Sequence, residues 1–297
     1  MSKIDATKPT TSHQVKGNGV LSGFVQNIGY EVMPFKGTAE KVLADVPTSV
    51  PLTVTATGGK GIDVTLNLVK RLAKEGYSVA PHLPARLFRD DAELADVVGQ
   101  LKDVDIRRVF IVGGDAPTPA GKFQDAYSLL QSLDEMGHHF EEVGIGGYPE
   151  GHALISDNAL HTAMNLKAPH ATRILTQICF NAETTTTWAE GLKRQGINLP
   201  IFIGMPGPVS RQKLMRISAG LGLGQSASFL KKQQNMFWRF FMPGGYRPDR
   251  LIKGLTSTVP QFDTNIQGFH IFTFNDLAET EIWRRQLVQT AIEQEGR

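Results

Sequence analysis

The chain has 297 residues, 41% of them hydrophobic, and a formal net charge of +2. This length supplies a sizeable core for one large domain or two ordinary ones. The basic residues are scattered apart from pairs such as Lys231-Lys232 and Arg284-Arg285, so the charge gives no case for binding nucleic acid. The single cysteine, Cys179, excludes an internal disulfide framework and a thiolate zinc cluster and fits a reducing compartment.

The first residues, MSKIDATKPTTSHQVKG, are polar and lack the apolar core of a signal peptide. No segment reaches the run of roughly 18 apolar residues that a membrane helix requires. We therefore expect a flexible tail over residues 1–20 in front of a cytoplasmic protein that binds no membrane.

Short β-branched runs alternate along the chain with segments whose apolar residues recur at helical spacing. In chain order, strands are predicted at 28–33, 52–57, 79–83, 109–112, 143–146, 173–179, 200–203 and 269–274. Helices are predicted at 38–44, 62–73, 91–101, 124–136, 156–166, 182–195, 211–221 and 279–293, with a further helical piece at 226–241.

Eight strand–helix units with short connections predict an α/β fold with a parallel sheet and helical crossovers. In a chain of this size, eight units favour a closed (β/α)8 barrel, the TIM barrel, over an open sheet. No repeat, linker or low-complexity stretch divides the sequence. We therefore expect a single domain over residues 21–297.

Two of the predicted strands end in the same way, with a Gly-Gly pair followed by polar residues. Gly113-Gly114 precedes Asp115, and Gly146-Gly147 precedes Tyr148 and the rest of the sequence YPEGH. Backbone without side chains lets a flat ligand approach closely, and the chemistry of a TIM barrel gathers at the carboxyl ends of its strands. The residues expected near those ends are Glu31, Thr55, His82, Asp115, Tyr148, His152, Gln177 and Asn275.

At these positions the sequence resembles the catalytic barrel of the methylenetetrahydrofolate reductase family. The resemblance runs from about residue 28 to residue 274 and rests on five motifs in the family's order, each at a strand end. They are YEVMP around Glu31, APHL around His82, GGDAPTPAGK around Asp115, GYPEGH at 147–152 and TQICF around Gln177. Weaker similarities are PGPVS near Pro208 and FHIFTFN ending at Asn275.

The resemblance implies an enzyme of one-carbon metabolism and methionine biosynthesis that interconverts 5,10-methylenetetrahydrofolate and 5-methyltetrahydrofolate. In the family, NAD(P)H usually reduces a bound FAD first, and tetrahydrofolate is the one-carbon carrier. Glu31 would be the general acid that protonates the folate N10, a role that needs a carboxyl group shielded from water. Asp115 would be a second catalytic residue, touching the pterin and influencing the flavin through its charge.

The resemblance also implies the binding residues. The amide of Gln177 would face the pterin edge or the nicotinamide, and Asp115 and Asn275 would also contact the folate. The residues implied for FAD are Thr55, His82, Gly113, Gly114, Asp115, Tyr127, Tyr148, His152 and Lys167. We predict no metal site.

From the residues alone, several of these positions fit a structural role equally well. Gly-Asp-x-Pro is ordinary turn chemistry, so Asp115 could be a turn residue. Tyr127 could belong to the core under a helix, and His82 and His152 could be structural. Cys179 is expected to be buried apolar volume.

Three positions and one segment depart from the family. Gly113 and Asp276 stand where many relatives carry arginine, and Leu214 stands where a glutamine is expected. After the fifth predicted strand, Lys167 is the clearest survivor of a run of basic residues. These changes weaken the expected contacts to the FAD diphosphate.

Three alternatives therefore stay open beside the flavin-dependent reductase. Hydride could pass directly from NAD(P)H to the folate, the barrel could be a non-redox, pterin-binding methyltransferase type, or the chain could be a non-catalytic partner subunit. The aromatic residues at 237–241 could form a homo-oligomer interface or pack against the barrel. Sequence does not fix the direction of the reaction.

Overall fold

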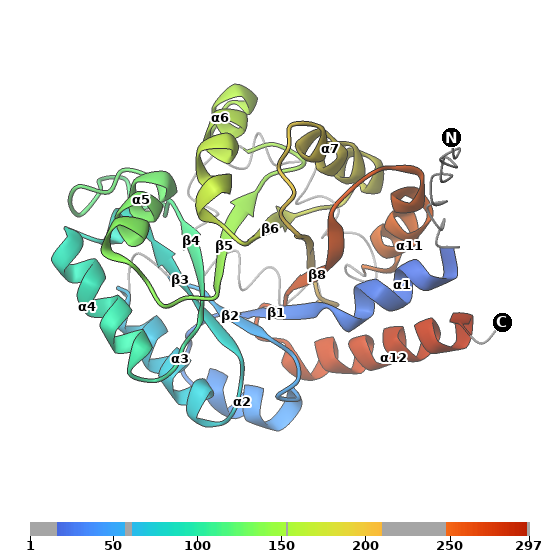
Figure 1. Ribbon diagram of the computed structural model, residues 1–297. Helices are drawn as coiled ribbons and strands as arrows, with labels where there is room; N and C mark the ends of the chain where they lie inside the picture. Colours follow the sequence, from blue (N-terminus) through green and yellow to red (C-terminus); the bar gives the residue numbers. More distant parts are fainter. Residues whose placement is uncertain (1–16, 57–60, 153, 210–247, 296–297) are drawn as a thin grey trace, which may run out of the picture.

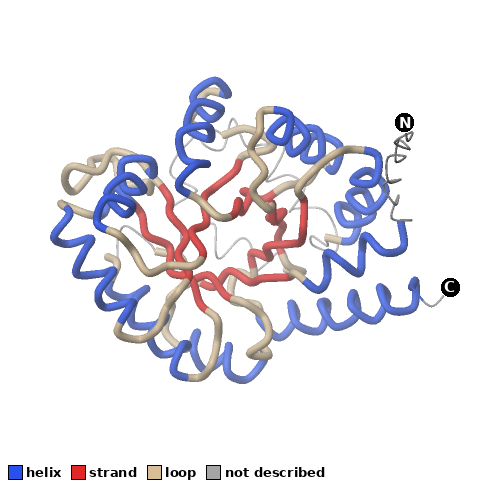
Figure 2. Tube along the Cα trace, in the orientation of Figure 1, coloured by secondary structure: helices blue, strands red, loops and turns tan. Residues whose placement is uncertain are grey.

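The computed structural model describes residues 17–56, 61–152, 154–209 and 248–295. Its eight strands are all parallel and follow one another around a closed barrel, with β8 pairing back onto β1. Figure 1 shows this ring of strands enclosed by helices, and Figure 2 shows the same two layers in red and blue. The predicted (β/α)8 barrel is therefore confirmed.

The strands are β1 (Ile28–Val32), β2 (Leu52–Val54), β3 (Val79–Pro84), β4 (Arg108–Val112), β5 (Glu142–Gly147), β6 (Arg173–Ile178), β7 (Ile201–Pro206) and β8 (Ile266–Phe272). The helices are α1 (Gly17–Gln26), α2 (Thr38–Asp45), α3 (Asp63–Lys74), α4 (Asp91–Lys102), α5 (Ala126–Met136), α6 (Asp157–Lys167), α7 (Ala182–Arg194), α11 (Asp249–Thr258) and α12 (Leu277–Glu295). Three short 3-10 helices are η1 (Ala85–Leu87), η2 (Ala168–His170) and η3 (Val259–Gln261).

Two of these helices, α1 and α11, were missing from the elements predicted from sequence. Helix α1 lies alongside α12 (Figure 1) and buries Leu21, Phe24 and Val25, with the Phe24 ring 5.1 Å from that of Phe269 on β8. Residue 20, the predicted end of the tail, therefore falls inside a packed helix. The helices predicted at 211–221 and 226–241 lie outside the described residues.

Alternation along each strand separates the barrel interior from the layer under the helices. On β1, Tyr30 and Val32 are fully buried, and the Tyr30 hydroxyl reaches α12, whereas Glu31 points to histidines of β3 and β8. An apolar cluster of Phe110, Leu175 and Phe202, from β4, β6 and β7, is separate from the main core. We infer that it fills the interior, which is a packed core and not a pore.

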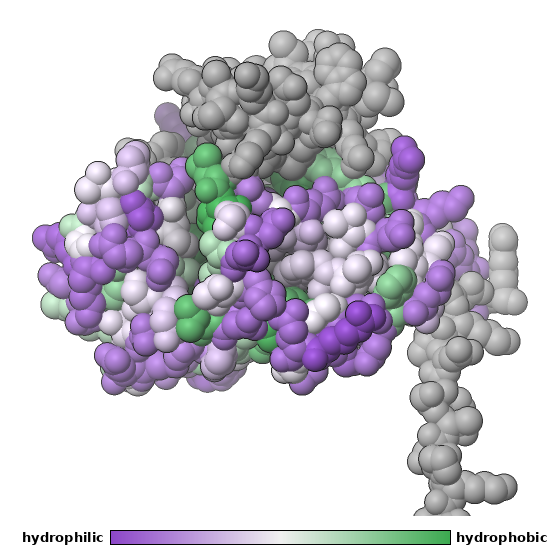
Figure 3. Space-filling view, turned by 90° about the horizontal axis from the view of Figure 1, so that it is seen from above, coloured by the Kyte–Doolittle hydropathy of each residue, from purple (hydrophilic) through white to green (hydrophobic). Residues whose placement is uncertain are grey.

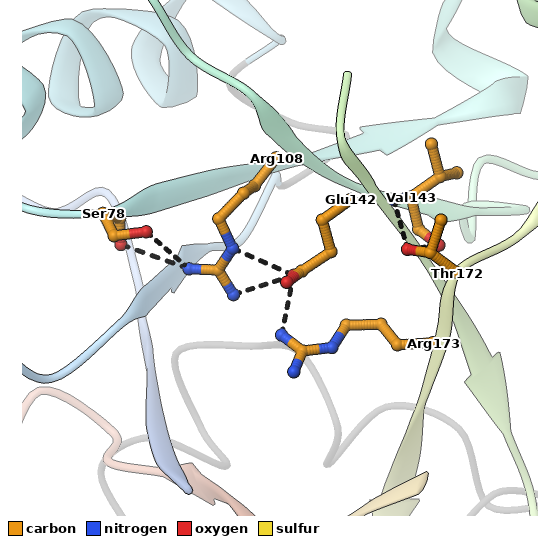
Figure 4. A network of polar contacts seen from close by, with 6 residues as sticks. All are labelled: Ser78, Arg108, Glu142, Val143, Thr172 and Arg173. Carbon is orange, nitrogen blue, oxygen red and sulfur yellow. Dashed lines mark hydrogen bonds and ion pairs between the residues drawn. The ribbon is translucent and has the colours of Figure 1, made fainter. Parts of the chain in front are cut away.

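A network of charges lies at the amino-terminal ends of β4, β5 and β6 (Figure 4). Glu142 accepts hydrogen bonds from Arg108 Nε at 2.9 Å and Arg173 Nη1 at 2.7 Å. The Arg173 guanidinium also stacks 3.8 Å from the centroid of Phe202, and its burial lowers its pKa while Glu142 opposes that shift. These charges are bonded to one another within the protein, and in a TIM barrel the reactive groups gather at the opposite, carboxyl end of the strands.

The face seen in Figure 3 is mostly hydrophilic with scattered hydrophobic residues. Such a surface is expected where amphipathic helices turn their apolar sides toward the strands. Among the helices of the described ranges, none combines the length and the apolar character that crossing a membrane requires.

A buried polar contact fastens β1 to α12. The Tyr30 hydroxyl donates to Glu281 Oε2 at 3.0 Å, and the same carboxylate accepts from Arg284 at 2.7 and 2.8 Å and from Arg285 at 2.9 Å. Burial raises the pKa of Glu281, but the bonds from these partners outweigh it and leave the pKa below its ordinary value. Burial, followed by the nearby Glu281 charge, raises the pKa of Tyr30.

We predict that removing Tyr30 and removing Glu281 from this contact lower the free energy of unfolding by different amounts. Tyr30→Phe removes one hydroxyl and leaves the carboxylate bound to both arginines, so the free energy of unfolding should fall by about 1 kcal/mol. Glu281→Leu leaves a buried hydroxyl and Arg284 without their acceptor, so the loss should be larger, about 3 kcal/mol. Urea unfolding of the two variants checks this order, and an equal effect would contradict it.

Candidate active site

The carboxyl ends of the parallel strands bring most of the predicted site residues to one mouth of the barrel. Glu31 lies near the end of β1, His82 in the second half of β3, Gln177 in β6, and Tyr148 directly after β5. Gly113, Gly114 and Asp115 follow β4. Residues far apart in the sequence thus face a common space because every strand runs in the same direction.

Glu31 stands between two histidines. Its Oε2 lies 3.6 Å from His82 Nε2 and 3.6 Å from His270 Nε2, slightly beyond hydrogen-bond length. The exposed fractions of the side chains are 14% for Glu31, 10% for His82 and 4% for His270. Glu31 is therefore a largely shielded carboxyl group.

His270 was not among the residues predicted from sequence. It lies on β8 with Phe272 two residues later, and its ring packs edge-on against Phe272 at 5.2 Å. The alternation of side-chain direction along FHIFTF could have identified it. Phe269 and Ile271 face the helical layer, so His270 between them faces the barrel interior.

Four buried polar atoms of this region have no hydrogen-bond partner among the described residues. They are Thr53 Oγ1 and Thr55 Oγ1 on and after β2, His82 Nε2 and His270 Nε2. A buried polar group left unsatisfied costs about 1–3 kcal/mol, so such groups are rare unless something else pairs with them. Two of these atoms, His82 Nε2 and His270 Nε2, face Glu31 Oε2. The hydroxyls of Thr55 and of Thr53, which pairs with Glu31 between β1 and β2, are left for a polar ligand.

Burial sets the charge of His82. It lowers the pKa of the imidazole to about 4, with Glu31 raising it and His270 lowering it further. The His82 ring lies 4.7 Å from Phe110 in the interior apolar cluster, which accounts for the loss of water around it. His82 is therefore neutral at neutral pH.

The backbone around Glu31 is held by the turn after β8. Thr273 Oγ1 donates to the Glu31 carbonyl at 2.6 Å, and Asn275 N donates to the same hydroxyl at 3.1 Å. Phe274 and Asn275 both have positive φ, 50° and 56°, a region that non-glycine residues seldom adopt. The strained turn is stabilised by the contacts it makes to β1.

Asn275 uses its amide within this turn. Its Oδ1 accepts from Met33 N at 2.9 Å, and its Nδ2 donates to Met33 O at 2.9 Å and to Thr38 Oγ1 at 2.8 Å. The side chain joins the end of β8 to the end of β1. The folate contact predicted for Asn275 stays a prediction, and the described geometry gives this residue a positioning role.

The loop that carries Asp115 is clamped by Arg86 in η1. The guanidinium donates to the carbonyls of residues 116 (2.7 Å), 117 (2.7 Å) and 124 (3.1 Å). Gly121 crosses the chain so closely that a Cβ there would lie 1.9 Å from Arg89 O, and Gly114 has φ +86°. These contacts fix the loop backbone while Asp115 itself is exposed at the mouth.

The loop after β5 carries a second group of predicted residues. The ring of Tyr148 meets that of His152 edge-on at 5.2 Å, and burial raises the pKa of Tyr148 and lowers that of His152. Glu150 accepts from Phe180 N at 2.6 Å and Asn181 N at 2.7 Å, so it fastens this loop to the start of α7.

Lys167, at the end of α6, is buried and donates from Nζ to Gly146 O at 3.1 Å. Burial lowers its pKa to about 8, and Asp125 opposes the shift. Tyr127, on α5, is partly exposed with its ring 5.6 Å from that of His170. Both side chains therefore already contact other protein groups, Lys167 through Gly146 O and Tyr127 through the His170 ring.

Gln177 is exposed on β6, next to an irregular register between Leu175 and Ile178. Its Oε1 accepts from Ile178 N at 2.9 Å. A Cβ at Gly204 on β7 would lie 2.2 Å from Thr176 O, so glycine permits this close crossing. Cys179 is fully buried, and burial raises its thiol pKa to about 12, as suits inert apolar volume.

The described residues contain no group of three or more His, Cys, Asp or Glu side chains arranged to hold a metal ion.

The sequence matches one protein family over most of the barrel. Residues 32–222 match the family model described as methylenetetrahydrofolate reductase. The 5,10-methylenetetrahydrofolate reductase of Buchnera aphidicola subsp. Schizaphis graminum (strain Sg) is 26% identical over 163 residues, which cover 52% of this chain and 53% of that relative. The match thus spans about half the length of the curated relative.

Two solved structures are similar in fold. One, an uncharacterized protein from Clostridium thermocellum that binds two copies of 5-methyl-5,6,7,8-tetrahydrofolic acid, has a TM-score of 0.54 and 14% identity, covering 94% of this chain and 99% of its own. The other, 2,3-dimethylmalate lyase of the PEP mutase/isocitrate lyase superfamily, has a TM-score of 0.50 and 10% identity, covering 97% and 90%. At these identities the likeness concerns the barrel alone.

We predict that Arg86→Lys loosens the Asp115 loop. Lysine cannot reproduce the planar fork that reaches three carbonyls. The free energy of unfolding should fall by about 1–2 kcal/mol, and amide hydrogen exchange should rise in residues 113–122. Lys122→Gln, which removes the ion pair with Asp91 at the same loop, is the matched control and should change exchange less. Unchanged exchange in Arg86→Lys would contradict the clamp.

The buried His82 predicts a loss of stability in acid. Because its pKa falls from 6.5 in the unfolded chain to about 4 in the fold, the unfolded state binds more protons between these values. The contribution of neutral His82 to the free energy of unfolding is therefore fully present above pH 6.5. It is lost as pH falls toward 4, by up to about 3 kcal/mol. His82→Asn should flatten this part of the pH profile relative to the unmodified chain in urea unfolding. Parallel profiles would exclude His82 as the cause.

Proposed function

Because the chain belongs to the methylenetetrahydrofolate reductase family, whose model matches residues 32–222, we propose that it interconverts 5,10-methylenetetrahydrofolate and 5-methyltetrahydrofolate. The observation that carries this proposal is Glu31, a shielded carboxyl group at the mouth of the barrel with unpaired buried polar atoms around it. The similar Clostridium thermocellum protein binds 5-methyltetrahydrofolic acid, so a barrel of this kind can hold the proposed product.

Glu31 is the proposed general acid. Its proton passes to the folate N10, the bond from N10 to the bridging carbon breaks, and the electron pair stays on N10. The carbon, now an iminium on N5, accepts hydride and becomes the methyl group. General acid catalysis requires a group that is placed within reach and shielded from water, which fits the geometry of Glu31.

Asp115 and Gln177 are the proposed contacts to the pterin. An exposed carboxylate on a clamped loop and an exposed amide on β6 face the same mouth. A pterin edge presents both donors and acceptors, which a carboxylate and an amide can match. Asp115 also places a negative charge near the reacting ring system.

We propose FAD as the cofactor and NAD(P)H as the reductant. The unpaired Thr55 hydroxyl, the neutral His82 ring and the partly buried pair Tyr148 and His152 fit a ligand with a flat ring and a polyhydroxyl chain. FAD, when bound, would take hydride from NAD(P)H and supply it to the folate carbon. Gly113 and Gly114 offer close backbone approach, and Tyr127 and Lys167 are the remaining proposed contacts.

A second candidate is direct hydride transfer from NAD(P)H to the folate. Few positive charges are available to bind the FAD diphosphate, which favours this candidate. The Lys167 ammonium is buried and donates to Gly146 O. Gly113 and Asp276 stand where the resemblance leads us to expect arginines. The absorption spectrum of the purified protein, with and without added FAD, separates the two. Folate binding without NAD(P)H oxidation would point instead to a non-redox pterin protein.

Cytoplasmic location, methionine biosynthesis, self-association and the domain limits at residues 20 and 21 stay predictions. The single buried thiol of Cys179 fits a reducing compartment. Analytical ultracentrifugation would measure the oligomeric state.

The central test is Glu31→Gln, which keeps the shape but has no acidic proton. Reduction of methylenetetrahydrofolate should fall by about 100-fold or more, whereas electron transfer from NAD(P)H to an artificial acceptor should persist. Glu135→Gln, a change at an exposed residue near the end of α5, is the matched control and should leave both activities unchanged. Equal loss of both activities in Glu31→Gln would contradict the proposed role.

A further inference from the structure

The strand β8 brings a second imidazole to Glu31. His270 Nε2 lies 3.6 Å from Glu31 Oε2, the same distance and the same oxygen as His82 Nε2. In the ladder between β1 and β8, His270 pairs with Gly29, two residues before Glu31. Its backbone therefore lies nearer the amino-terminal end of the barrel than that of Glu31.

His270 is 3% exposed, and its Nε2 is buried without a hydrogen-bond partner among the described residues. Burying such an atom is costly unless it is paired. In the described part of the chain, the carboxylate that lies within ion-pair distance of this nitrogen is that of Glu31. Closing the gap by about half an ångström would form a hydrogen bond.

A single oxygen between two imidazoles suits both states of a general acid. An acid whose proton sits on Oε1, and the carboxylate left when that proton has gone, can both accept at Oε2 from an imidazole N–H. Because both histidines address Oε2, the other oxygen, Oε1, is left for the substrate. His82 is neutral at neutral pH and therefore does not hold the acid as a fixed ion pair.

On the premise of the proposed function, we propose that His270 is a positioning residue that binds Oε2 of Glu31, turns Oε1 toward the folate and stabilises the carboxylate formed once the proton has left. His82, by contrast, also belongs to the proposed flavin site. The ionisable groups that face Glu31 within the described residues are His82 from β3 and His270 from β8.

The test compares His270→Leu with His270→Gln, whose amide can still hydrogen-bond to Glu31. In single-turnover reduction of methylenetetrahydrofolate, His270→Leu should lower the rate by at least about 10-fold, the effect of one hydrogen bond to a charged group. The midpoint of its pH–rate profile should move, the folate KM should change little, and His270→Gln should restore part of the rate. Flavin content and electron transfer to an artificial acceptor should be retained.

Two controls separate a positioning role from a folding defect. His139→Leu removes a partly buried histidine that binds Ile106 O away from the mouth, and it should leave the pH profile unchanged. In a Glu31→Gln background, His270→Leu should cause no further loss of rate, because the group it positions is gone. An unshifted pH profile, or additive losses in the double variant, would overturn the proposal.

The activity of the unmodified protein distinguishes failure of the proposed function from failure of the His270 proposal. If the unmodified protein did not reduce methylenetetrahydrofolate, the reaction assignment would fall. The pairing would then be tested by infrared titration of the Glu31 carboxyl, identified by its loss in Glu31→Gln. A shift of that titration in His270→Leu supports the pairing, and an unchanged titration excludes it.

Discussion

The pairing of β8 with β1 is the constraint on which the rest of the structure depends. It closes the parallel sheet into a barrel and sets His270, near the end of the chain, beside Glu31, near its beginning. The same closure lets Thr273 donate to the Glu31 carbonyl and lets Asn275 bind Met33 through both ends of its amide. A shift of one residue in this register would turn Glu31 toward the helices and end the site.

Burial then gives the mouth its chemistry. The interior apolar cluster below His82 excludes water and keeps that imidazole neutral, while the charges of Arg108, Glu142 and Arg173 are paired at the other end of the barrel. The charged groups at one end of the barrel are therefore hydrogen-bonded to one another, whereas the other end retains buried polar atoms without partners among the described residues. This asymmetry is what a ligand-binding mouth requires, because a ligand can supply the missing hydrogen bonds.

The departures from the family pattern are partly explained by neighbouring residues. Gly113 stands where relatives often carry arginine, yet the loop after it is still held by a guanidinium, that of Arg86 from the preceding strand–helix unit. This clamp contacts backbone carbonyls and so fixes the position of Asp115 without facing the ligand itself. Lys167 is present as the resemblance predicted, but its ammonium donates to Gly146 O.

Sequence alone determined the fold class and the family, because strand–helix alternation and motifs at strand ends are local patterns. It also identified Glu31 and the glycines and loops of the mouth as candidates. Helices α1 and α11 were missed, and α1 was assigned in part to a tail, because its stability comes from packing against α12 and β8. The nearness of His270 to Glu31, the use of the Asn275 amide and the Arg86 clamp were decided only by the tertiary structure, since each joins residues brought together by barrel closure or by the packing of adjacent units.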